Sequence, residues 1–334
     1  MVLSKRQTKR EGASREHLPR RFSVERGAGP LSVVDLPVHG SRESRNDRGG
    51  IFLHRGGGGM SPAYPLEGVV SWNMNTTCNY RCSYCTQRFV DNRKQWARDL
   101  PKFVEGFLAL PGDWEIKLSG GEPFTHPEFL ALVDALVRGG RRVSVVTNFS
   151  ASRETLATYA EATRARPGVL SASLHLEYAD PLDFAEKLAW FQGIHAGSVV
   201  ATCVATRESL PKLPAMVQQF RALGVTLRVQ PEKQDRDVIG YTEAERAEIL
   251  ALGGHNGTGW VDPSFEGKMC WAGARYLIVD HQGEAYRCYP ARRYRQERLG
   301  NILDGSLRLA REPKTCGYTY CNCTVPPQRG MVGA

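Results

Sequence analysis

The residues best suited to chemistry are three cysteines in the segment CNYRCSYC, residues 78–85. Cys78, Cys82 and Cys85 are separated by three residues and then by two, so their thiolates can curl round one [4Fe–4S] cluster. Three thiolates leave one iron of such a cluster without a protein ligand, and a small molecule can bind there. A zinc ion closed by a distant histidine is the alternative, but zinc sites usually draw their cysteines in C-x2-C to C-x4-C pairs.

Short β-rich runs alternate with amphipathic helical patterns from Gly68 onward, which predicts repeated βαβ units. A first helix is expected near residues 94–110. The expected strands are residues 68–75, 114–120, 141–149, 169–177, 198–206 and 225–232. Repeats of one unit predict an α/β fold, a partial (β/α)6 TIM-like barrel over residues 66–255. In such a barrel, catalytic groups lie at the carboxyl ends of the strands, where the cysteine triplet falls.

The C-x3-C-x2-C spacing, with Tyr84 directly before the last cysteine, resembles the hallmark of the radical S-adenosylmethionine (SAM) enzymes. The resemblance implies that Cys78, Cys82 and Cys85 hold a [4Fe–4S] cluster whose open iron is chelated by the amino and carboxylate groups of SAM. Reductive cleavage of SAM would release a 5′-deoxyadenosyl radical that abstracts hydrogen from a substrate. A low-potential electron donor, such as a flavodoxin or ferredoxin, is then an expected partner.

The second strand ends in SGGEP, which resembles the family's Gly-Gly-Glu-Pro loop that binds the SAM amino group. Glycines let a backbone approach a ligand closely, and the Glu122 carboxylate can accept a hydrogen bond from an ammonium. An ordinary strand-to-helix turn is the alternative, because Thr125 to Glu128 looks like a capping box. The resemblance nominates as SAM contacts Tyr84, Gly120, Gly121, Glu122 and Pro123.

Polar residues at later strand ends are further candidates. The third strand ends in TNF, similar to the family's Thr-Asn segment near the SAM ribose and carboxylate, which nominates Asn148. Ser173, His175 and Glu177 alternate along the fourth strand, so they are expected to point to one face. Satisfied polar groups in the core are the alternative. If that face is the barrel interior, Ser173 contacts SAM, and the candidate catalytic residues His175 and Glu177 contact substrate. Glu232, which alternates with Arg228 and Gln230 along the sixth strand, is a third candidate catalytic residue.

A second group of cysteines lies near the carboxyl end of the chain: Cys270, Cys288, Cys316, Cys321 and Cys323. Two strand-like runs joined by residues 281–283 predict a hairpin that brings Cys270 and Cys288 together. The arrangement resembles the start of a Twitch or SPASM domain, which binds an auxiliary [4Fe–4S] cluster, although the C-x4-C-x-C ending departs from the fuller SPASM pattern. Two fully cysteine-ligated clusters would need eight thiolates, so the five present favour one auxiliary cluster with four of them as ligands. The domain that holds it is expected to span residues 256–334. A structural zinc ion is the alternative.

Cys203 lies in the apolar fifth strand and is expected to be a buried free cysteine. The chain's nine cysteines are an odd number, and no apolar segment of signal-peptide type opens the sequence. A reducing cytoplasm is therefore expected, with metal or redox chemistry in place of a disulfide framework. No apolar run is long enough to predict a membrane span.

The net charge of +9 is concentrated at the amino end. Residues 1–60 hold twelve Lys and Arg against six Asp and Glu, and they lack apolar periodicity, which predicts a disordered basic tail. A nucleic-acid-binding arm, or translation that begins at Met60, are alternatives for this segment. The rest of the chain is nearly balanced in charge, so nucleic acid is not an expected partner.

The auxiliary cluster suggests an electron acceptor and hence net oxidation of a substrate, which is a small molecule, a carbohydrate or a peptide. Redox-neutral epimerisation or elimination, with a structural C-terminal metal site, is the alternative within the class. A non-catalytic zinc-binding or nucleic-acid adaptor is the alternative from another class, and it predicts colourless protein with zinc and no iron.

Overall fold

Strands and helices alternate along the computed structural model, which describes residues 68–234, 237–252, 265–319 and 325–333. The main strands are β1 (Gly68–Asn75), β2 (Trp114–Gly120), β3 (Arg142–Thr147), β4 (Pro167–Leu174), β5 (Ser198–Ala205), β6 (Leu227–Pro231), β10 (Tyr276–Val279), β11 (Glu284–Tyr286) and β12 (Arg298–Asn301). Short strands are β7 (Lys233–Gln234), β8 (Asp237–Val238), β9 (Met269–Cys270) and β13 (Lys314–Thr315). The helices are α1 (Arg93–Leu108), α2 (Phe129–Arg138), α3 (Arg153–Ala162), α4 (Pro181–Gln192), α5 (Leu213–Ala222), α6 (Glu243–Ala251), α7 (Tyr289–Tyr294) and α8 (Val325–Gln328), with 3-10 turns η1 (Pro123–Thr125) and η2 (Leu210–Lys212).

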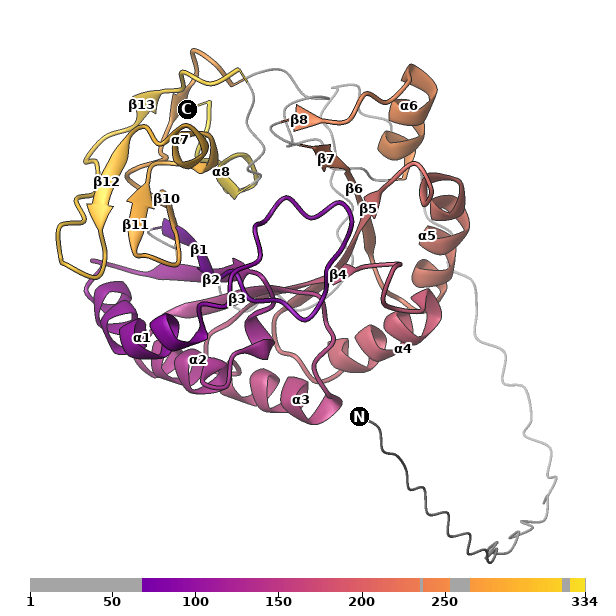
Figure 1. The fold of residues 1–334 in the computed structure, drawn as a ribbon, viewed down its shortest axis with the longest axis horizontal. Helices are drawn as coiled ribbons and strands as arrows, with labels where there is room; N and C mark the ends of the chain where they lie inside the picture. The colour runs from indigo at the N-terminus through magenta and orange to yellow at the C-terminus, as the bar shows by residue number, and fades with distance from the viewer. Residues whose placement is uncertain (1–67, 235–236, 253–264, 320–324, 334) are drawn as a thin grey trace, which may run out of the picture. The chain divides into compact units, whose positions relative to one another are not determined.

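One nine-stranded sheet organises the described chain, in the order β12-β11-β10-β1-β2-β3-β4-β5-β6. Strands β1 to β6 are parallel neighbours in chain order, and β10 adds a further parallel strand beside β1. Helices α1 to α5 form an arc outside these strands (Figure 1). The sheet ends at β12 and β6 and does not close, so the expected α/β fold with a parallel sheet is confirmed as a partial barrel.

The helix-facing side of the strands is apolar and fully packed. In β1, Val70, Trp72 and Met74 are all buried, and the Trp72 ring lies 4.5 Å from Phe103 and 4.9 Å from Phe107 of α1. Burying a side chain of this size contributes about 1.5–3 kcal/mol relative to leaving it exposed. This packing fixes the carboxyl ends of the strands, from which the candidate site is built.

The opposite side of the strands is polar and contacts the carboxyl-terminal part of the chain. Glu115 of β2 is almost fully buried, and its carboxylate accepts hydrogen bonds from Ser144 of β3 at 2.7 Å and from Arg329 at 2.6 Å. Tyr276 of β10 donates to Ser71 of β1 at 3.2 Å. The carboxyl-terminal segment is therefore anchored on the inner face of the sheet by an ion pair with a buried carboxylate.

The fourth strand is shorter than the sequence predicts. It ends at Leu174, because the N–H groups of Tyr178 and Ala179 both donate to the carbonyl of His175 and form a turn. The expectation that Ser173, His175 and Glu177 share one face of one strand is therefore wrong. Similarly, β6 ends at Pro231, one residue before Glu232.

The capping box expected at Thr125 is also wrong. The residue before α2 is Glu128, whose side chain makes no capping hydrogen bond, and Thr125 closes the 3-10 turn η1 by donating to the carbonyl of Glu122 at 2.7 Å. His126 has an extended backbone, with ψ 127°, because Pro127 follows it, and this residue separates η1 from α2.

The predicted hairpin is confirmed. Strands β10 and β11 pair antiparallel, with Ile278 opposite Tyr286, and residues 280–283 connect them, one residue more than the sequence predicted. Gly283 has φ 84°, and a Cβ there would lie 2.4 Å from Asn301 Oδ1, so the turn needs glycine. The expected amino-terminal tail and the cysteines Cys321 and Cys323 lie outside the described residues.

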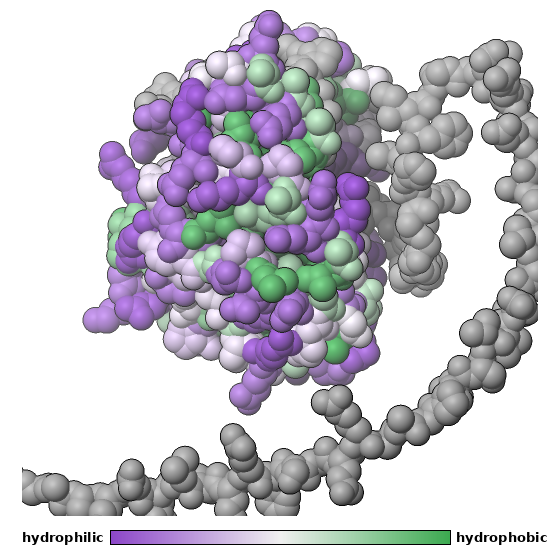
Figure 2. Space-filling view, turned by 90° about the vertical axis from the view of Figure 1, so that its right-hand side faces the viewer, coloured by the Kyte–Doolittle hydropathy of each residue, from purple (hydrophilic) through white to green (hydrophobic). Residues whose placement is uncertain are grey.

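In the described part of the chain, no helix has the length and apolar character needed to cross a membrane. The face on which α5 and α6 lie carries mostly hydrophilic residues, and its hydrophobic residues form separate patches (Figure 2). Single exposed apolar side chains such as Leu223 and Leu250 are usual on protein surfaces.

Candidate active site

The cysteine loop, residues 76–92, connects the carboxyl end of β1 to α1 and passes over the middle of the sheet (Figure 1). Cys78 and Cys82 are partly buried, and Cys85 is exposed. The triplet therefore lies at the end of the sheet where the sequence predicts chemistry.

The surroundings of Cys78 and Cys82 favour the neutral thiol. Burial raises the pKa of Cys78, with smaller contributions from Glu122 and Cys85. Burial, Glu177 and the neighbouring cysteines raise the pKa of Cys82 to about 11. Thiolates that repel one another in this way need positive charge before they can ionise together, and iron supplies it. The donor set thus fits a group that carries several iron ions.

The turn after β4 holds the cysteine loop from the other side. The Glu177 carboxylate accepts hydrogen bonds from the Ser83 N–H at 3.1 Å and the Ser83 hydroxyl at 2.6 Å. The Tyr178 hydroxyl accepts from the Arg81 N–H at 2.8 Å, and its ring stacks on Tyr80 with centroids 4.2 Å apart. These contacts fix the backbone on both sides of Cys82.

His175, at the start of the same turn, contacts both the thiol and the aromatic residue of the motif. Its Nδ1 lies 2.8 Å from the Tyr84 hydroxyl and 3.3 Å from Cys82 Sγ. Burial lowers the pKa of His175 and raises that of Tyr84. The sequence predicted SAM binding for Tyr84 and substrate contact for His175 and Glu177. The structure brings all three to the cysteine loop, and their roles stay predictions.

Replacing Glu177 by Ala is expected to weaken iron retention at the cysteine loop, because the variant loses the carboxylate that holds Ser83. These bonds are exposed, so a net loss of about 1 kcal/mol, or roughly a fivefold faster release of iron, is expected. Release into a chelator under anaerobic conditions measures the effect. The control is Glu186→Ala on the exposed side of α4, and equal release from both variants would contradict the prediction.

Glu122 ties the ends of β2 and β3 together. Its side chain is fully buried; Oε1 accepts from the Thr147 hydroxyl at 2.8 Å and the Phe124 N–H at 3.0 Å, and Oε2 accepts from the Asn148 N–H at 2.6 Å. Burial raises its pKa to about 7, against the opposing effect of these bonds. The Asn148 side chain donates to Asn79 in the cysteine loop at 2.8 Å. The carboxylate thus joins the ends of β2 and β3, and the Asn148 side chain extends the link to the cysteine loop, while the contact of Glu122 with a SAM ammonium stays a prediction.

The raised pKa of Glu122 predicts a pH dependence of the free energy of unfolding. Its contribution is fully present below the ordinary pKa, near 4.5, and is lost as pH rises through about 7, because burial disfavours the ionised form. The loss approaches about 3 kcal/mol at most. Urea unfolding at pH 5 and pH 8 should show this fall in the wild type and a smaller fall in Glu122→Gln. The exposed Glu128→Gln should behave as wild type, and the same fall in all three proteins would contradict the prediction.

Gly120 and Gly121 are required by the chain's own packing. A Cβ at Gly121 would lie 2.0 Å from the Thr77 carbonyl oxygen, and Gly120 has φ 133° with its Cβ position 2.3 Å from the Asn75 carbonyl oxygen. The two glycines therefore allow a close approach to the end of β1 and the start of the cysteine loop, while their expected contact with SAM stays a prediction. Pro123 is buried in the adjoining turn η1.

Replacing Gly121 by Ala is expected to displace the cysteine loop and to lower the free energy of unfolding by about 1–3 kcal/mol, the usual cost of overpacking. Chemical unfolding measures the loss. The control is Gly240→Ala, where a Cβ meets nothing within 4 Å. Equal free energies of unfolding for the two variants would contradict the prediction, because they would show that the cysteine loop moves aside without loss of stability.

Ser173 and Glu232 are not joined to the cysteine loop by any contact that the structure records for the described residues. The Ser173 hydroxyl accepts from Thr202 of β5 at 3.3 Å. The Glu232 N–H donates to the Tyr241 hydroxyl at 2.8 Å, which holds the chain after β6. Their expected contacts with SAM and substrate stay predictions.

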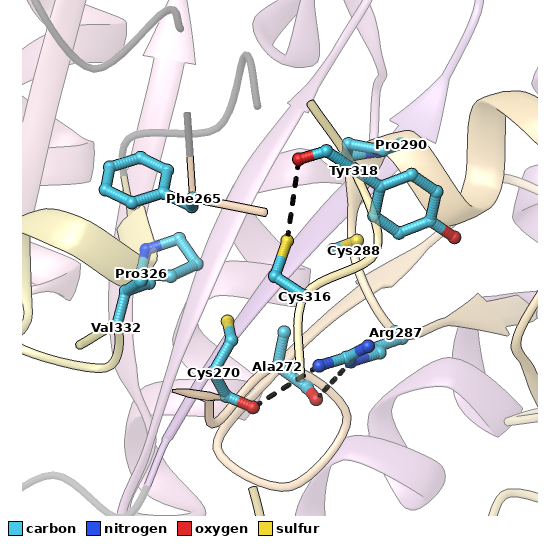
Figure 3. Close-up of a pocket in the computed structure, with 10 residues that line it drawn as sticks. All are labelled: Phe265, Cys270, Ala272, Arg287, Cys288, Pro290, Cys316, Tyr318, Pro326 and Val332. Carbon is cyan, nitrogen blue, oxygen red and sulfur yellow. Dashed lines mark hydrogen bonds between the residues drawn. The ribbon is translucent and has the colours of Figure 1, made fainter. Parts of the chain in front are cut away.

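A second candidate site lies in the carboxyl-terminal part. Cys270, Cys288 and Cys316 come from three separate segments and line one pocket (Figure 3). The pocket is lined by Phe265, Cys270, Ala272, Arg287, Cys288, Pro290, Cys316, Tyr318, Pro326 and Val332. The hairpin thus brings Cys270 and Cys288 to one pocket, as predicted. Among the residues that the structure describes, no three His, Cys, Asp or Glu side chains are grouped closely enough for a single metal ion.

Cys203 takes no part in either group of cysteines. It is buried in β5, its thiol donates to the Val204 carbonyl at 3.7 Å, and burial raises its pKa to about 12. Burial of Cys203 as a small apolar residue is confirmed.

Comparison with known proteins decides the family of the core site. Residues 72–190, which include the cysteine loop, match the model of the Radical SAM superfamily. This segment is a radical SAM domain. The domain marks the chain as an enzyme, and the family implies a [4Fe–4S] cluster at which SAM is cleaved.

The known proteins that resemble this chain are distant from it in sequence. A GTP 3′,8-cyclase of Mannheimia succiniciproducens is 26% identical over 118 residues, which is 34% of each chain, so the match spans about a third of that protein. The structure of Streptococcus suis SuiB bound to its precursor peptide SuiA has a TM-score of 0.50 at 13% identity, covering 72% of this chain and 64% of SuiB. Native anSMEcpe with bound AdoMet and a peptide has a TM-score of 0.48 at 16% identity, covering 72% and 78%. At such identities the likeness to SuiB shows the fold alone.

Sequence reasoning missed several residues that hold the radical SAM site together. Thr147 binds Glu122, and Asn79 binds Asn148. The cysteine loop is connected to the turn after β4 by Ser83 and Tyr178. No local pattern in the sequence marks these residues, because Thr147 lies 25 residues from Glu122 and the other contacts join residues about 70 to 100 positions apart.

Proposed function

We propose that Cys78, Cys82 and Cys85 bind a [4Fe–4S] cluster and that the chain uses it to cleave SAM reductively and abstract hydrogen from a substrate. The observation that carries this proposal is the cysteine loop, held at the carboxyl end of the parallel sheet by contacts from the ends of β2, β3 and β4. When bound, the cluster supplies one electron to the SAM sulfonium, which yields methionine and a 5′-deoxyadenosyl radical.

The chain's own residues would position SAM and shape its surroundings. Glu122, once ionised, would accept from the SAM ammonium, with Asn148 and Ser173 near the ribose and carboxylate. His175 contacts both the Tyr84 hydroxyl and the Cys82 thiol, so Tyr84 lies close to a proposed cluster ligand. From there Tyr84 would cover one side of the bound SAM. His175 and Glu177 hold the cysteine loop in the structure, and they would face the substrate together with Glu232 if the loop shifts when the site is loaded.

We further infer that the carboxyl-terminal pocket is a Twitch/SPASM-like site for one auxiliary [4Fe–4S] cluster, with four ligands among Cys270, Cys288, Cys316, Cys321 and Cys323. The three described cysteines that line one pocket support it. An auxiliary cluster would take one electron from the substrate radical, so that loss of a hydrogen atom and an electron gives net two-electron oxidation. Redox-neutral epimerisation or elimination, with zinc or another structural metal in the pocket, is the second candidate.

The substrate is proposed as a small molecule, a carbohydrate or a peptide. SuiB was solved with its precursor peptide, and its shared fold keeps a peptide among the candidates. A flavodoxin or ferredoxin in a reducing, cytoplasmic compartment would deliver the electron. The non-catalytic zinc or nucleic-acid adaptor does not fit a chain that carries a radical SAM domain.

Iron and acid-labile sulfide analysis after anaerobic reconstitution tests this proposal. Two [4Fe–4S] sites predict about eight irons per chain, and the core site alone predicts about four. Brown protein with broad charge-transfer absorption is expected. Zinc without iron in protein purified under strict anaerobiosis would contradict both sites.

A further inference from the structure

Arg287 lies beneath the cysteines of the carboxyl-terminal pocket, and only 4% of its surface is exposed (Figure 3). Its Nε donates to the Ala272 carbonyl at 2.9 Å, and Nη2 donates to the Cys270 carbonyl at 3.4 Å. The same guanidinium donates to the carbonyls of Lys314 at 2.7 Å and Thr315 at 3.3 Å. One buried side chain thus binds two other segments of the backbone at once.

Each of these contacts adjoins a cysteine of the pocket. Cys270 is itself bound through its carbonyl, Thr315 directly precedes Cys316, and Arg287 directly precedes Cys288. The three cysteine-bearing segments are therefore tied to one planar group. A guanidinium offers five N–H donors in a fixed fork, and a lysine ammonium cannot reproduce that geometry.

The Glu297 carboxylate balances the charge of Arg287. Glu297 Oε1 accepts from Arg287 Nη1 at 3.0 Å, and Glu297 Oε2 accepts from the Tyr318 hydroxyl at 2.8 Å. The Glu297 side chain is 34% exposed, whereas that of Arg287 is 5% exposed. Arg287 and Tyr318 both line the pocket, so the hydrogen-bonded series Arg287–Glu297–Tyr318 begins and ends at the pocket wall.

We propose that the Arg287–Glu297 ion pair has two roles at the C-terminal metal site: it gathers the three cysteine segments before metal binds, and its two charges set the reduction potential of the bound cluster. The inference rests on the proposed function, in which this pocket holds an auxiliary cluster. Both residues are positioning residues, since neither is a proposed metal ligand.

The two charges predict opposite effects on the potential. A nearby cation stabilises the more negative, reduced state of a cluster and raises its potential, while an anion lowers it. Removing the Arg287 charge leaves Glu297 uncompensated, so the potential should fall. Removing the Glu297 charge leaves Arg287 uncompensated, so the potential should rise. A residue that only supports the fold gives no such pair of opposite shifts.

The experiment uses full-length protein in which Cys78, Cys82 and Cys85 are Ala, so that the C-terminal site holds all the iron. A redox titration followed by electron paramagnetic resonance is expected to give a lower midpoint potential for Arg287→Gln and a higher one for Glu297→Gln. Arg287→Lys should keep the potential near that of the parent protein but lose iron to a chelator about tenfold faster or more, because the fork is lost. Arg298→Gln on β12 is the control, since it removes the same charge from a more exposed ion pair, formed with Glu284 of β11, and should leave the potential unchanged.

The outcomes distinguish the presence of an auxiliary cluster from the two roles of the Arg287–Glu297 ion pair. A parent protein without iron overturns the auxiliary cluster itself and this inference with it. Iron in the parent, with shifts of the same sign or no shifts in the Arg287 and Glu297 variants, overturns the electrostatic role alone. Arg287→Lys that retains iron as the parent does overturns the positioning role. If Arg287→Gln does not fold, Glu297→Gln and Arg287→Lys still decide both points.

Discussion

Replacing Cys78, Cys82 and Cys85 together by Ala is expected to abolish formation of 5′-deoxyadenosine and to halve the bound iron, from about eight to about four per chain. The effect is complete because no open iron remains to bind SAM. Product analysis by liquid chromatography after incubation with SAM and dithionite measures the first quantity, and iron analysis measures the second.

The control for this variant is Cys203→Ala, which removes a thiol from the same barrel without touching a proposed ligand. Cys203 is 2% exposed in β5, so this change should cost only a small packing term and leave iron and SAM cleavage unchanged. A triple variant that still forms 5′-deoxyadenosine, or a Cys203 variant that loses iron, would contradict the assignment of the cysteine loop.

Replacing Cys270 and Cys288 by Ala is expected to lower the iron content to about four per chain while SAM cleavage by dithionite is at least partly retained. Turnover of the substrate should be lost, because the acceptor for its electron is gone. The uncoupled assay with dithionite and SAM alone keeps this test independent of the substrate's identity.

A full loss of SAM cleavage in this double variant would show that the two sites are structurally dependent. Zinc recovered in the wild type, in place of the second set of four irons, would keep the core assignment and remove the oxidative mechanism. Both cysteines are buried, so the free energy of unfolding should be measured alongside to separate ligand loss from a packing defect.

The features that the sequence predicts well are local ones. The cysteine triplet, the alternation of strand and helix and the turn at residues 281–283 each depend on residues within about ten positions of one another, and local pattern rules apply to them. The structure agrees with each in kind and, apart from the ends of strands such as β4 and β6, in place, including the position of the triplet after β1.

The features that the sequence does not predict depend on long-range contacts. The Glu122 carboxylate is held by Thr147 and Asn148, about 25 residues away, and this reveals a buried link between strands where the sequence predicted an open ligand contact. The early end of β4 follows from a turn that the alternation of polar residues hides. Arg287 has no motif around it, because its partners are backbone carbonyls of distant segments, and a carbonyl is present at every position.

The central claim is that the chain cleaves SAM at an iron–sulfur cluster, and it is tested most directly on the wild-type protein. Anaerobically reconstituted enzyme, supplied with dithionite and SAM, should form 5′-deoxyadenosine and methionine in equal amounts over several turnovers, with no product when iron is withheld. Protein that carries its full complement of iron and sulfide yet forms no 5′-deoxyadenosine would contradict the account.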